Sequence, residues 1–384
     1  MLKKISYQIN LSFRFTAFLL FAFSGLQLSA QINKTDSTQY ALEGKYHYGI
    51  VIPHHTNMTY IINDYSQGIE FSFIRRRFKS GVWERNFNRP ETGLGFWYST
   101  FGRKDIYGEG MALFSFINFR LFDWGPISAK YNISPGIGYA HKPFKIGENT
   151  YNTVFGSHIN AYLGLGLMVN YKLVKGVTAS SSFSIKHMSN GSSRKPNAGI
   201  NTATLTFGLI YDLDPNSKDP DIQIKKPEPS SAREFLATIS ATRNQPAAYN
   251  PTRYWSGSLT LTHLWYRKKT KAYGAGLDLI HFGGAPYALK NFEEIDPFAK
   301  YGFADYFYAG LFGTMESHLG TTALYMSAGA YIYQKTKPRQ PLYARLGIRQ
   351  KITGNLLAHV GIKANFFTAE FVEFGIGYRW KYRN

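Results

Sequence analysis

The sequence of 384 residues contains no cysteine, and after its N-terminal segment it contains no apolar run as long as a membrane-spanning helix, about 20 residues. The first absence excludes a disulfide framework and a thiolate metal site. The second excludes a bundle of transmembrane helices. Acidic residues are also scarce, because 24 Asp and Glu stand against 44 Lys and Arg and leave a formal net charge of +20.

The N-terminal segment has the composition of a secretory signal peptide. Lys3, Lys4 and Arg14 give it a basic start, an apolar stretch follows, and residues 28–30 (Leu-Ser-Ala) resemble a small-residue cleavage site. We therefore expect residues 1–30 to be removed on export. Nucleic acid is not an expected partner of an exported chain. The basic surplus is better matched by phosphate-rich lipopolysaccharide, or it reflects solvated loops.

Aromatic residues are abundant, at 17% of the chain, and apolar residues alternate with polar or small ones from about Tyr40 onward. The segment 159–171 is the clearest case, because all its odd-numbered residues are apolar. Alternation over this length fits a strand that crosses an outer membrane, about 9–11 residues, better than a soluble sandwich strand of about 5–6 residues. The last such segment, 372–380, has an aromatic end at Trp380.

Similar segments predict an all-β fold, an antiparallel transmembrane β-barrel. The expected strands begin near Leu42, Gly68, Gly93, Gly110, Ile127, His158, Val177, Asn201, Arg233, Tyr254, Tyr273, Phe307, Ala323, Leu342, Leu356 and Val372. We expect one barrel of about 12–16 strands, and the alternative is a barrel of about 8 strands followed by a second β unit. Residues 213–231 are polar and proline-rich, and we expect them to form a periplasmic linker between a PagL-like barrel region of residues 31–212, which holds the candidate hairpin, and a second set of strands in residues 232–384.

The stretch 181–201 carries the candidate chemistry. In a strand, Phe183, Ile185, His187 and Ser189 share one face, because successive side chains point to opposite sides. In a membrane barrel this would be the face toward hydrocarbon, where polar groups are unusual. His187 can accept the proton of the Ser189 hydroxyl, as nucleophilic catalysis requires. A histidine at a barrel rim is also common as an interfacial residue.

The residues that follow offer the remaining parts of an esterase site. Asn190, with its neighbour Gly191, is the candidate oxyanion hole. Asn201 opens the next strand on the same face as His187, so it can hold one tautomer of the imidazole if the two strands pair. No histidine spacing predicts a metal site and no glycine-rich loop leads into a helix, so we expect no metal and no cofactor.

Residues 187–191 (His-Met-Ser-Asn-Gly) and 196–201 (Pro-Asn-Ala-Gly-Ile-Asn) resemble the PagL-type lipid A 3-O-deacylases, outer-membrane barrels that include bacterial acyloxyacyl hydrolases. Residues 46–49, Pro53-His54 and the segment 370–380 resemble the family more weakly. The resemblance implies a protein of the cell outer membrane that hydrolyses an ester-linked acyl chain of lipid A.

By the same resemblance Ser189 is the nucleophile, His187 the general base, and Asn190 a residue of the oxyanion hole. The family places a glutamate where this chain has Asn201. Glu148 and Glu294, in expected outer loops, are candidate substitutes for its charge. The alternative function is a non-enzymatic barrel, porin-like or structural, with a degenerate catalytic site.

Overall fold

The computed structural model describes residues 38–77, 81–216, 228–248, 250–285, 302–335, 340–365 and 368–383. The expected signal peptide and most of the expected linker lie outside the described residues. The helices are short: α2 (Thr56–Ile61), α3 (Val82–Asn86) and the 3-10 helix η3 (Phe303–Tyr306). Among the described residues, no helix has the length and apolar character needed to cross a membrane.

Antiparallel strands make up most of the described chain, and each begins within a few residues of an expected position. The first group is β1 (Thr38–Val51), β2 (Ser66–Arg77), β3 (Glu91–Thr100), β4 (Glu109–Trp124), β5 (Ile127–Ala140), β6 (Ile159–Val174), β7 (Val177–Ser189) and β8 (Ile200–Asp212). The second group is β9 (Arg233–Asn244), β10 (Tyr254–Lys268), β11 (Lys271–Phe282), β12 (Phe307–Leu319), β13 (Thr322–Gln334), β14 (Leu342–Thr353), β15 (Leu356–Asn365) and β16 (Thr368–Arg383).

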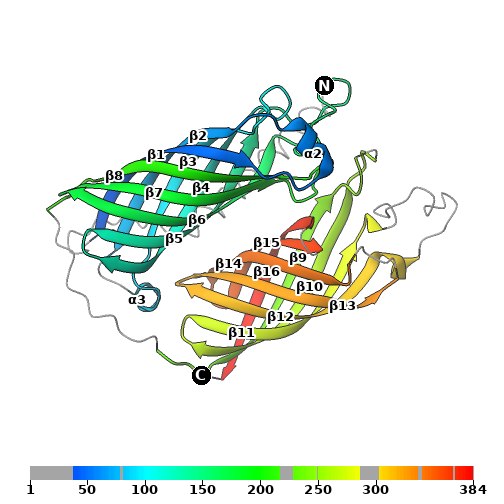
Figure 1. Cartoon of the computed structure of the whole chain (residues 1–384). Helices are drawn as coiled ribbons and strands as arrows, with labels where there is room; N and C mark the ends of the chain where they lie inside the picture. The colour runs from blue at the N-terminus through cyan, green and yellow to red at the C-terminus, as the bar shows by residue number, and fades with distance from the viewer. Residues whose placement is uncertain are drawn as a thin grey trace, which may run out of the picture.

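The strands close into two barrels of eight strands each (Figure 1). β8 pairs back onto β1, with Ala41 opposite Asp212, and β16 pairs back onto β9. The expectation of an all-β antiparallel barrel fold is therefore confirmed. The preference for a single barrel of about 12–16 strands is wrong, and the alternative that begins with an eight-stranded barrel is correct. The physical reason is that about eight strands already enclose an interior that side chains can fill.

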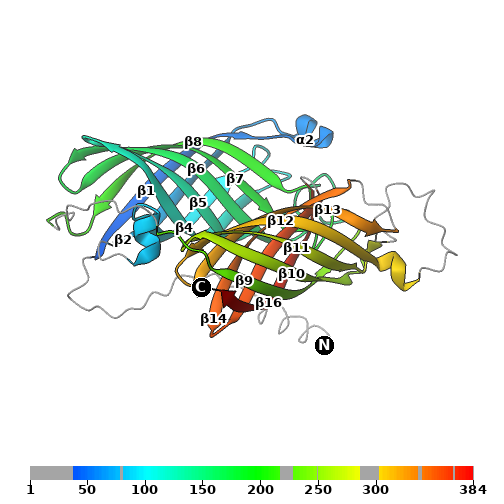
Figure 2. The ribbon, with the colours of Figure 1, turned by 90° about the horizontal axis from the view of Figure 1, so that it is seen from below.

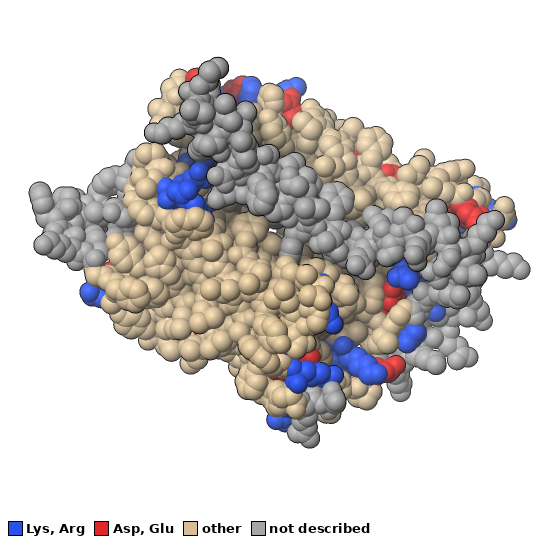
Figure 3. Space-filling view, turned by 180° about the vertical axis from the view of Figure 1, so that it is seen from behind, with Lys and Arg blue, Asp and Glu red and all other residues tan. Residues whose placement is uncertain are grey.

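The alternation in the sequence separates the outer wall of each barrel from its interior. In β6, Leu165, Leu167 and Val169 are exposed, whereas Asn160 and Asn170 are buried. The outer wall of the second barrel likewise exposes large apolar side chains from several strands. Figure 3 shows a broad face with few charged groups, and most of the visible Lys, Arg, Asp and Glu side chains lie toward its margins. A surface of this kind matches the apolar band of an outer-membrane barrel.

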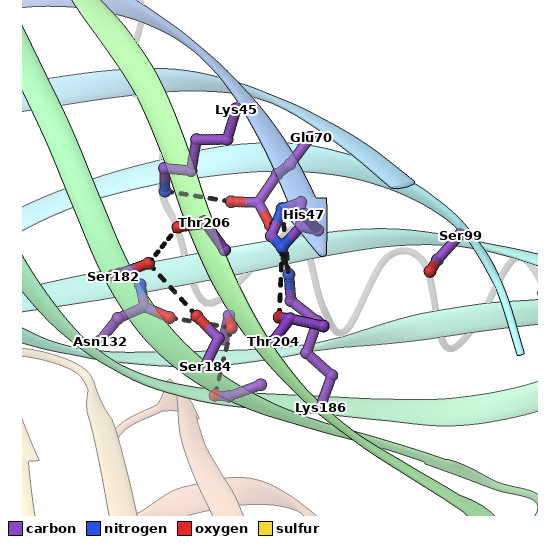
Figure 4. A network of polar contacts seen from close by, with 12 residues as sticks. Lys45, His47, Glu70, Ser99, Asn132, Ser182, Ser184, Lys186, Thr204 and Thr206 are labelled. Atoms are coloured by element: carbon purple, nitrogen blue, oxygen red, sulfur yellow. Dashed lines mark hydrogen bonds and ion pairs between the residues drawn. The ribbon is translucent and has the colours of Figure 1, made fainter. Parts of the chain in front are cut away.

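Charged and aromatic side chains fill the interior of the first barrel. Lys186 Nζ donates to Glu70 Oε2 over 2.9 Å, and Lys45 and His47 contact the same carboxylate (Figure 4). Lys186 also lies 5.3 Å from the ring centroid of Trp97. Because these groups are buried, each needs the partners that the neighbouring strands supply.

The interior of the second barrel is also filled by charged networks. Arg345 forms ion pairs with Asp278 and with Glu373, and all three side chains are buried. Toward the end at which β9 begins, Glu316 forms ion pairs with both Arg349 and Arg379. Side chains thus bridge the lumen from opposite strands and hold the wall of the barrel together.

The two barrels lie side by side with corresponding ends together (Figures 1 and 2). At the end where β1 and β9 begin, Asn86 Nδ2 of α3 donates to Thr270 Oγ1 of the β10–β11 turn over 3.3 Å. At the opposite end the loop after β7 contacts the loop after β9, where Gln245 N–H donates to Ser192 O over 2.9 Å. Both barrels therefore run in the same direction.

Candidate active site

The hairpin of β7 and β8 places the candidate catalytic residues opposite one another. In its antiparallel register His187 is directly paired with Asn201, while Ser189 is the last residue of β7. Directly opposite residues on one face of a sheet are near enough for their side chains to interact. The loop between the strands, residues 190–199, is called the oxyanion loop below.

A continuous hydrogen-bonded chain joins the three side chains. His187 Nε2 lies 2.9 Å from Ser189 Oγ, and His187 Nδ1 lies 2.7 Å from Asn201 Oδ1. An amide oxygen can only accept, so Nδ1 carries the proton and Nε2 is free to accept from the serine hydroxyl. This is the tautomer that general-base activation of a serine requires.

The three side chains belong to the outer wall of the first barrel. His187 is in line with Phe183 and Ile185, which are exposed, whereas Lys186 between them points into the lumen and is buried. Ser189 is only 3% exposed. The face that His187 shares with Phe183 and Ile185 places the site on the apolar outer wall, at the end of the barrel opposite to α3, and the low exposure of Ser189 reflects cover by the loop at Gly199.

Gly199 covers the serine and the histidine closely. Its φ is +75°, and a Cβ at this position would lie 2.9 Å from His187 Cε1 and 3.1 Å from Ser189 Cβ. Both the left-handed conformation and the contact distances require glycine. The backbone of the oxyanion loop is thus held against the side chains of Ser189 and His187.

His54, in the loop after β1, is a further member of the cluster that sequence reasoning did not place there. Its Nε2 donates to Ala198 O over 2.9 Å, which leaves Nδ1 to accept from Asn201 Nδ2 over 3.3 Å. This contact fixes the amide of Asn201 with its oxygen toward His187. His54 Nδ1 also lies 3.3 Å from Ile52 O. The only sequence signal was the weak resemblance at Pro53-His54.

The ring of His55 contacts the ring of His54, with centroids 4.8 Å apart. Burial, followed by the charges of His54 and Lys195, lowers the pKa of His55 below its ordinary value. A neutral His55 adds no positive charge beside His54. A polar hollow opens at this point, lined by Pro53, His54, His55, Thr56, Thr59 and Tyr60.

The two expected oxyanion residues, Asn190 and Gly191, differ in whether their N–H groups already have hydrogen-bond acceptors. The Asn190 backbone N–H donates to Asn197 Oδ1 over 2.9 Å, and its side chain donates to Ser157 Oγ over 3.0 Å. Gly191 is buried, and within the described residues its N–H meets no acceptor. Among the described residues two donors of this segment therefore meet no acceptor, the Gly191 N–H and the second hydrogen of Asn190 Nδ2. Both are candidate donors to a developing oxyanion.

The two glutamates considered as substitutes do not join the site. Glu148 forms an exposed ion pair with Lys145 in the loop between β5 and β6. Glu294 lies outside the described residues. Among the described residues no cluster of three or more His, Asp or Glu side chains has the arrangement of a metal site.

The fold and this cluster define a class of protein, a two-barrel chain with a serine–histidine–asparagine constellation on its outer wall. Sequence models of protein families identify the family. The model described as "Lipid A 3-O-deacylase (PagL)" matches residues 71–209, and the model described as "Acyloxyacyl hydrolase, C-terminal domain" matches residues 233–382. Each match falls within one barrel, and together they cover most of the chain. The chain belongs to the PagL-type family, a family of lipid A deacylases, which are hydrolases.

The chain was also compared with individual curated proteins and solved structures. No curated protein matches the chain. Among solved structures, Neisserial surface protein A is 7% identical and covers 45% of this chain and 96% of its own, with a TM-score of 0.30. A porin mutant from Rhodopseudomonas blastica is 6% identical, covers 89% and 100%, and has a TM-score of 0.17. A mutant of the monoaromatic hydrocarbon channel TodX is 8% identical, covers 90% and 90%, and has a TM-score of 0.17. The fold is defined by the strand pairing of the chain itself.

Proposed function

We propose that this protein is a serine esterase of the outer membrane that hydrolyses an ester-linked acyl chain of lipid A. One observation carries the proposal: Ser189, His187 and Asn201 form a hydrogen-bonded chain on the outer wall of the first barrel. A soluble esterase must extract its lipid from the bilayer. A nucleophile on the outer wall of a membrane barrel can instead meet an acyl ester within the leaflet.

The outer surface supports the membrane location. Large apolar side chains cover both barrel walls, as an environment of hydrocarbon requires. The site lies at the end of the first barrel that carries the longer loops, which in such barrels is the outer end. Lipopolysaccharide is therefore the substrate within reach of Ser189.

Acylation begins with attack of Ser189 Oγ on the ester carbonyl carbon. As the Oγ–C bond forms, the serine proton moves to His187 Nε2, and Asn201 Oδ1 holds the imidazolium through its Nδ1–H. The Gly191 N–H stabilises the carbonyl oxygen as it becomes an anion. The tetrahedral intermediate then collapses, the ester C–O bond breaks, and His187 returns its proton to the departing sugar oxygen.

Deacylation repeats these steps with water as the nucleophile. His187 Nε2 takes a proton from water as the water oxygen attacks the acyl-enzyme carbonyl. The second intermediate expels Ser189 Oγ, which recovers the proton from His187. The products are a free fatty acid and a lipid A that lacks one acyl chain. Each step requires neutral His187 as base, so the rate should fall in acid as its imidazole becomes protonated.

The interior of each barrel weighs against the porin-like alternative. Lys186, Glu70 and Trp97 fill the lumen of the first barrel, and Arg345 with its two carboxylate partners bridges the second. Barrels of about eight strands have interiors that side chains fill, whereas porins of about 16–18 strands leave a channel.

The test uses purified protein in detergent with lipopolysaccharide as substrate. We expect a fatty acid to be released and detected by mass spectrometry, and Ser189→Ala to reduce release to the background rate. The matched control is Ser193→Ala, in the same loop but outside the hydrogen-bonded chain. Equal release by wild type and Ser189→Ala would refute the proposal. Single-channel conductance in a planar bilayer, unaffected by Ser189→Ala, would favour the pore instead.

A further inference from the structure

The second barrel contacts the first at the loop that carries the oxyanion donor. Gln245, the residue immediately after β9, donates its backbone N–H to Ser192 O over 2.9 Å. Its side-chain Oε1 accepts from the Lys195 N–H over 3.1 Å. Ser192 Oγ in turn donates to Ala369 O of β16 over 2.8 Å. Three hydrogen bonds therefore cross from the oxyanion loop to the second barrel.

The side chain of Gln245 is held in one orientation by its own barrel. It is only 7% exposed. Its Nε2 donates to Ala247 O over 2.9 Å and to Asn250 O over 2.8 Å. With both amide hydrogens used on the β9–β10 loop, the Oε1 atom must face the Lys195 N–H. Gln245 is thus a rigid acceptor presented to the other barrel.

β16 also approaches the loop at the residue that carries the free N–H. Gly191 has a φ of +56°, and a Cβ there would lie 2.3 Å from Val372 Cγ2 and 3.2 Å from Val372 N. The wall of the second barrel therefore stands directly against Gly191, and only glycine fits this contact. Movement of the second barrel or of its β9–β10 loop would move the Gly191 N–H.

The barrels have a second contact that can serve as a comparison. At the opposite end Asn86 donates to Thr270, and a Cβ on Gly320 would lie 3.2 Å from Trp83 Nε1. This contact holds the barrels together but touches none of the candidate catalytic residues. It therefore separates the effect of joining the barrels from the effect of holding the loop.

We propose that the second barrel is an internal brace for the active site, and that Gln245 is the positioning residue through which it holds the oxyanion loop. This inference rests on the proposed esterase function. Gln245 touches neither substrate nor Ser189. It acts by fixing Ser192 and Lys195, and so the direction of the Gly191 N–H toward the oxyanion that forms beside Ser189.

The test is Gln245→Met in the full-length protein, because methionine keeps the volume of glutamine and removes its side-chain hydrogen bonds, including the one from the Lys195 N–H, while the backbone bond to Ser192 O remains. A misplaced oxyanion donor acts on the transition state, so we expect kcat to fall about tenfold to a hundredfold while KM stays within about twofold. Ser192→Ala, which removes the bond to Ala369, should show the same split between kcat and KM. Asn86→Ala should leave both constants unchanged.

Hydrogen exchange gives a second readout that does not depend on activity. We expect the Lys195 amide and the rest of the oxyanion loop to exchange faster in Gln245→Met and at the wild-type rate in Asn86→Ala. Unchanged kcat and exchange in Gln245→Met would overturn the brace. So would equal losses of kcat in Gln245→Met and Asn86→Ala, because a general weakening of the barrel interface would then explain both.

Failure of the esterase function itself gives a different result. If wild type and Ser189→Ala released fatty acid equally, the proposed function would fail, and the role of Gln245 in catalysis with it. Hydrogen exchange would still show whether Gln245 holds the oxyanion loop in place. Faster exchange of the loop in Gln245→Met alone would support the brace, and unchanged exchange would refute it.

Discussion

Asn201 is neutral, whereas the family resemblance implies a carboxylate at this position, so a negative charge can be introduced here. Asn201→Asp keeps the shape of the side chain and places a negative oxygen where Oδ1 lies 2.7 Å from His187 Nδ1. The second oxygen would take the place of Nδ2 and face His54 Nδ1. The imidazolium of His187 forms only as the serine is deprotonated, so the new charge acts mainly on the transition state.

The size of the effect follows from the distance and the exposure. Opposite charges about 4 Å apart interact by about 4 kcal/mol at an effective dielectric constant of about 20. Asn201 and His187 are both partly exposed, and solvent screening reduces this energy. About 1.5–3 kcal/mol remains, and about 1.4 kcal/mol corresponds to a tenfold change in rate. We therefore expect Asn201→Asp to raise kcat about tenfold to a hundredfold.

The assay is initial-rate release of fatty acid from lipopolysaccharide in detergent, measured at neutral pH. Asn201→Glu, which is longer by one methylene, should give a smaller gain, because its carboxylate must bend to reach Nδ1. Asn201→Ala should be slower than wild type, since it leaves the imidazole without an acceptor. A rate for Asn201→Asp equal to or below that of wild type would refute the view that His187 develops positive charge during the reaction.

Two further predictions concern the surroundings of the site, and a third concerns the interior of the second barrel. His54→Ala should lower kcat about fivefold, the value of one hydrogen bond of about 1 kcal/mol, because the amide beside the catalytic histidine loses its fixed orientation; His55→Ala is the control and should change the initial rate little. Gly199→Ala and Gly147→Ala both place alanine at positive φ, which should reduce the stability toward urea by about 1 kcal/mol in each case. The loss should be larger for Gly199→Ala, because its Cβ would also lie 2.9 Å from His187 Cε1, and only Gly199→Ala should lower kcat, by about a hundredfold. Arg345→Met leaves two buried carboxylates without their cation and should lower the unfolding free energy by about 3–5 kcal/mol, and an unchanged urea midpoint would contradict the assigned network.

The positions of the strands could be predicted from the sequence because the alternation is local. The apolar face of β6 and the His187–Ser189 spacing in β7 are visible in the sequence itself. The number of barrels was not visible, because closure depends on which strands pair over long distances. The local sequence near Asp212 does not indicate whether this strand pairs with β1, where Asp212 lies opposite Ala41, or with β9.

The candidate site was predicted in its local part and missed in its long-range part. His187, Ser189 and Asn201 lie in one hairpin, so their approach follows from antiparallel pairing. His54 and Gln245 come from distant loops. No period or spacing relates His54 to Asn201, 147 residues away, or Gln245 to Lys195, 50 residues away. Such contacts are products of the closed fold rather than of any local pattern.

The pairing of the first strand with the last has a consequence for how such a chain can be lengthened. In both barrels the chain enters and leaves at the same end, because Ala41 lies opposite Asp212 and Arg233 lies opposite Arg383. A second barrel with an even number of strands can therefore be appended without reversing the direction in which the first barrel is oriented. A module could therefore be gained or lost during evolution without moving the candidate site to the other end of the first barrel.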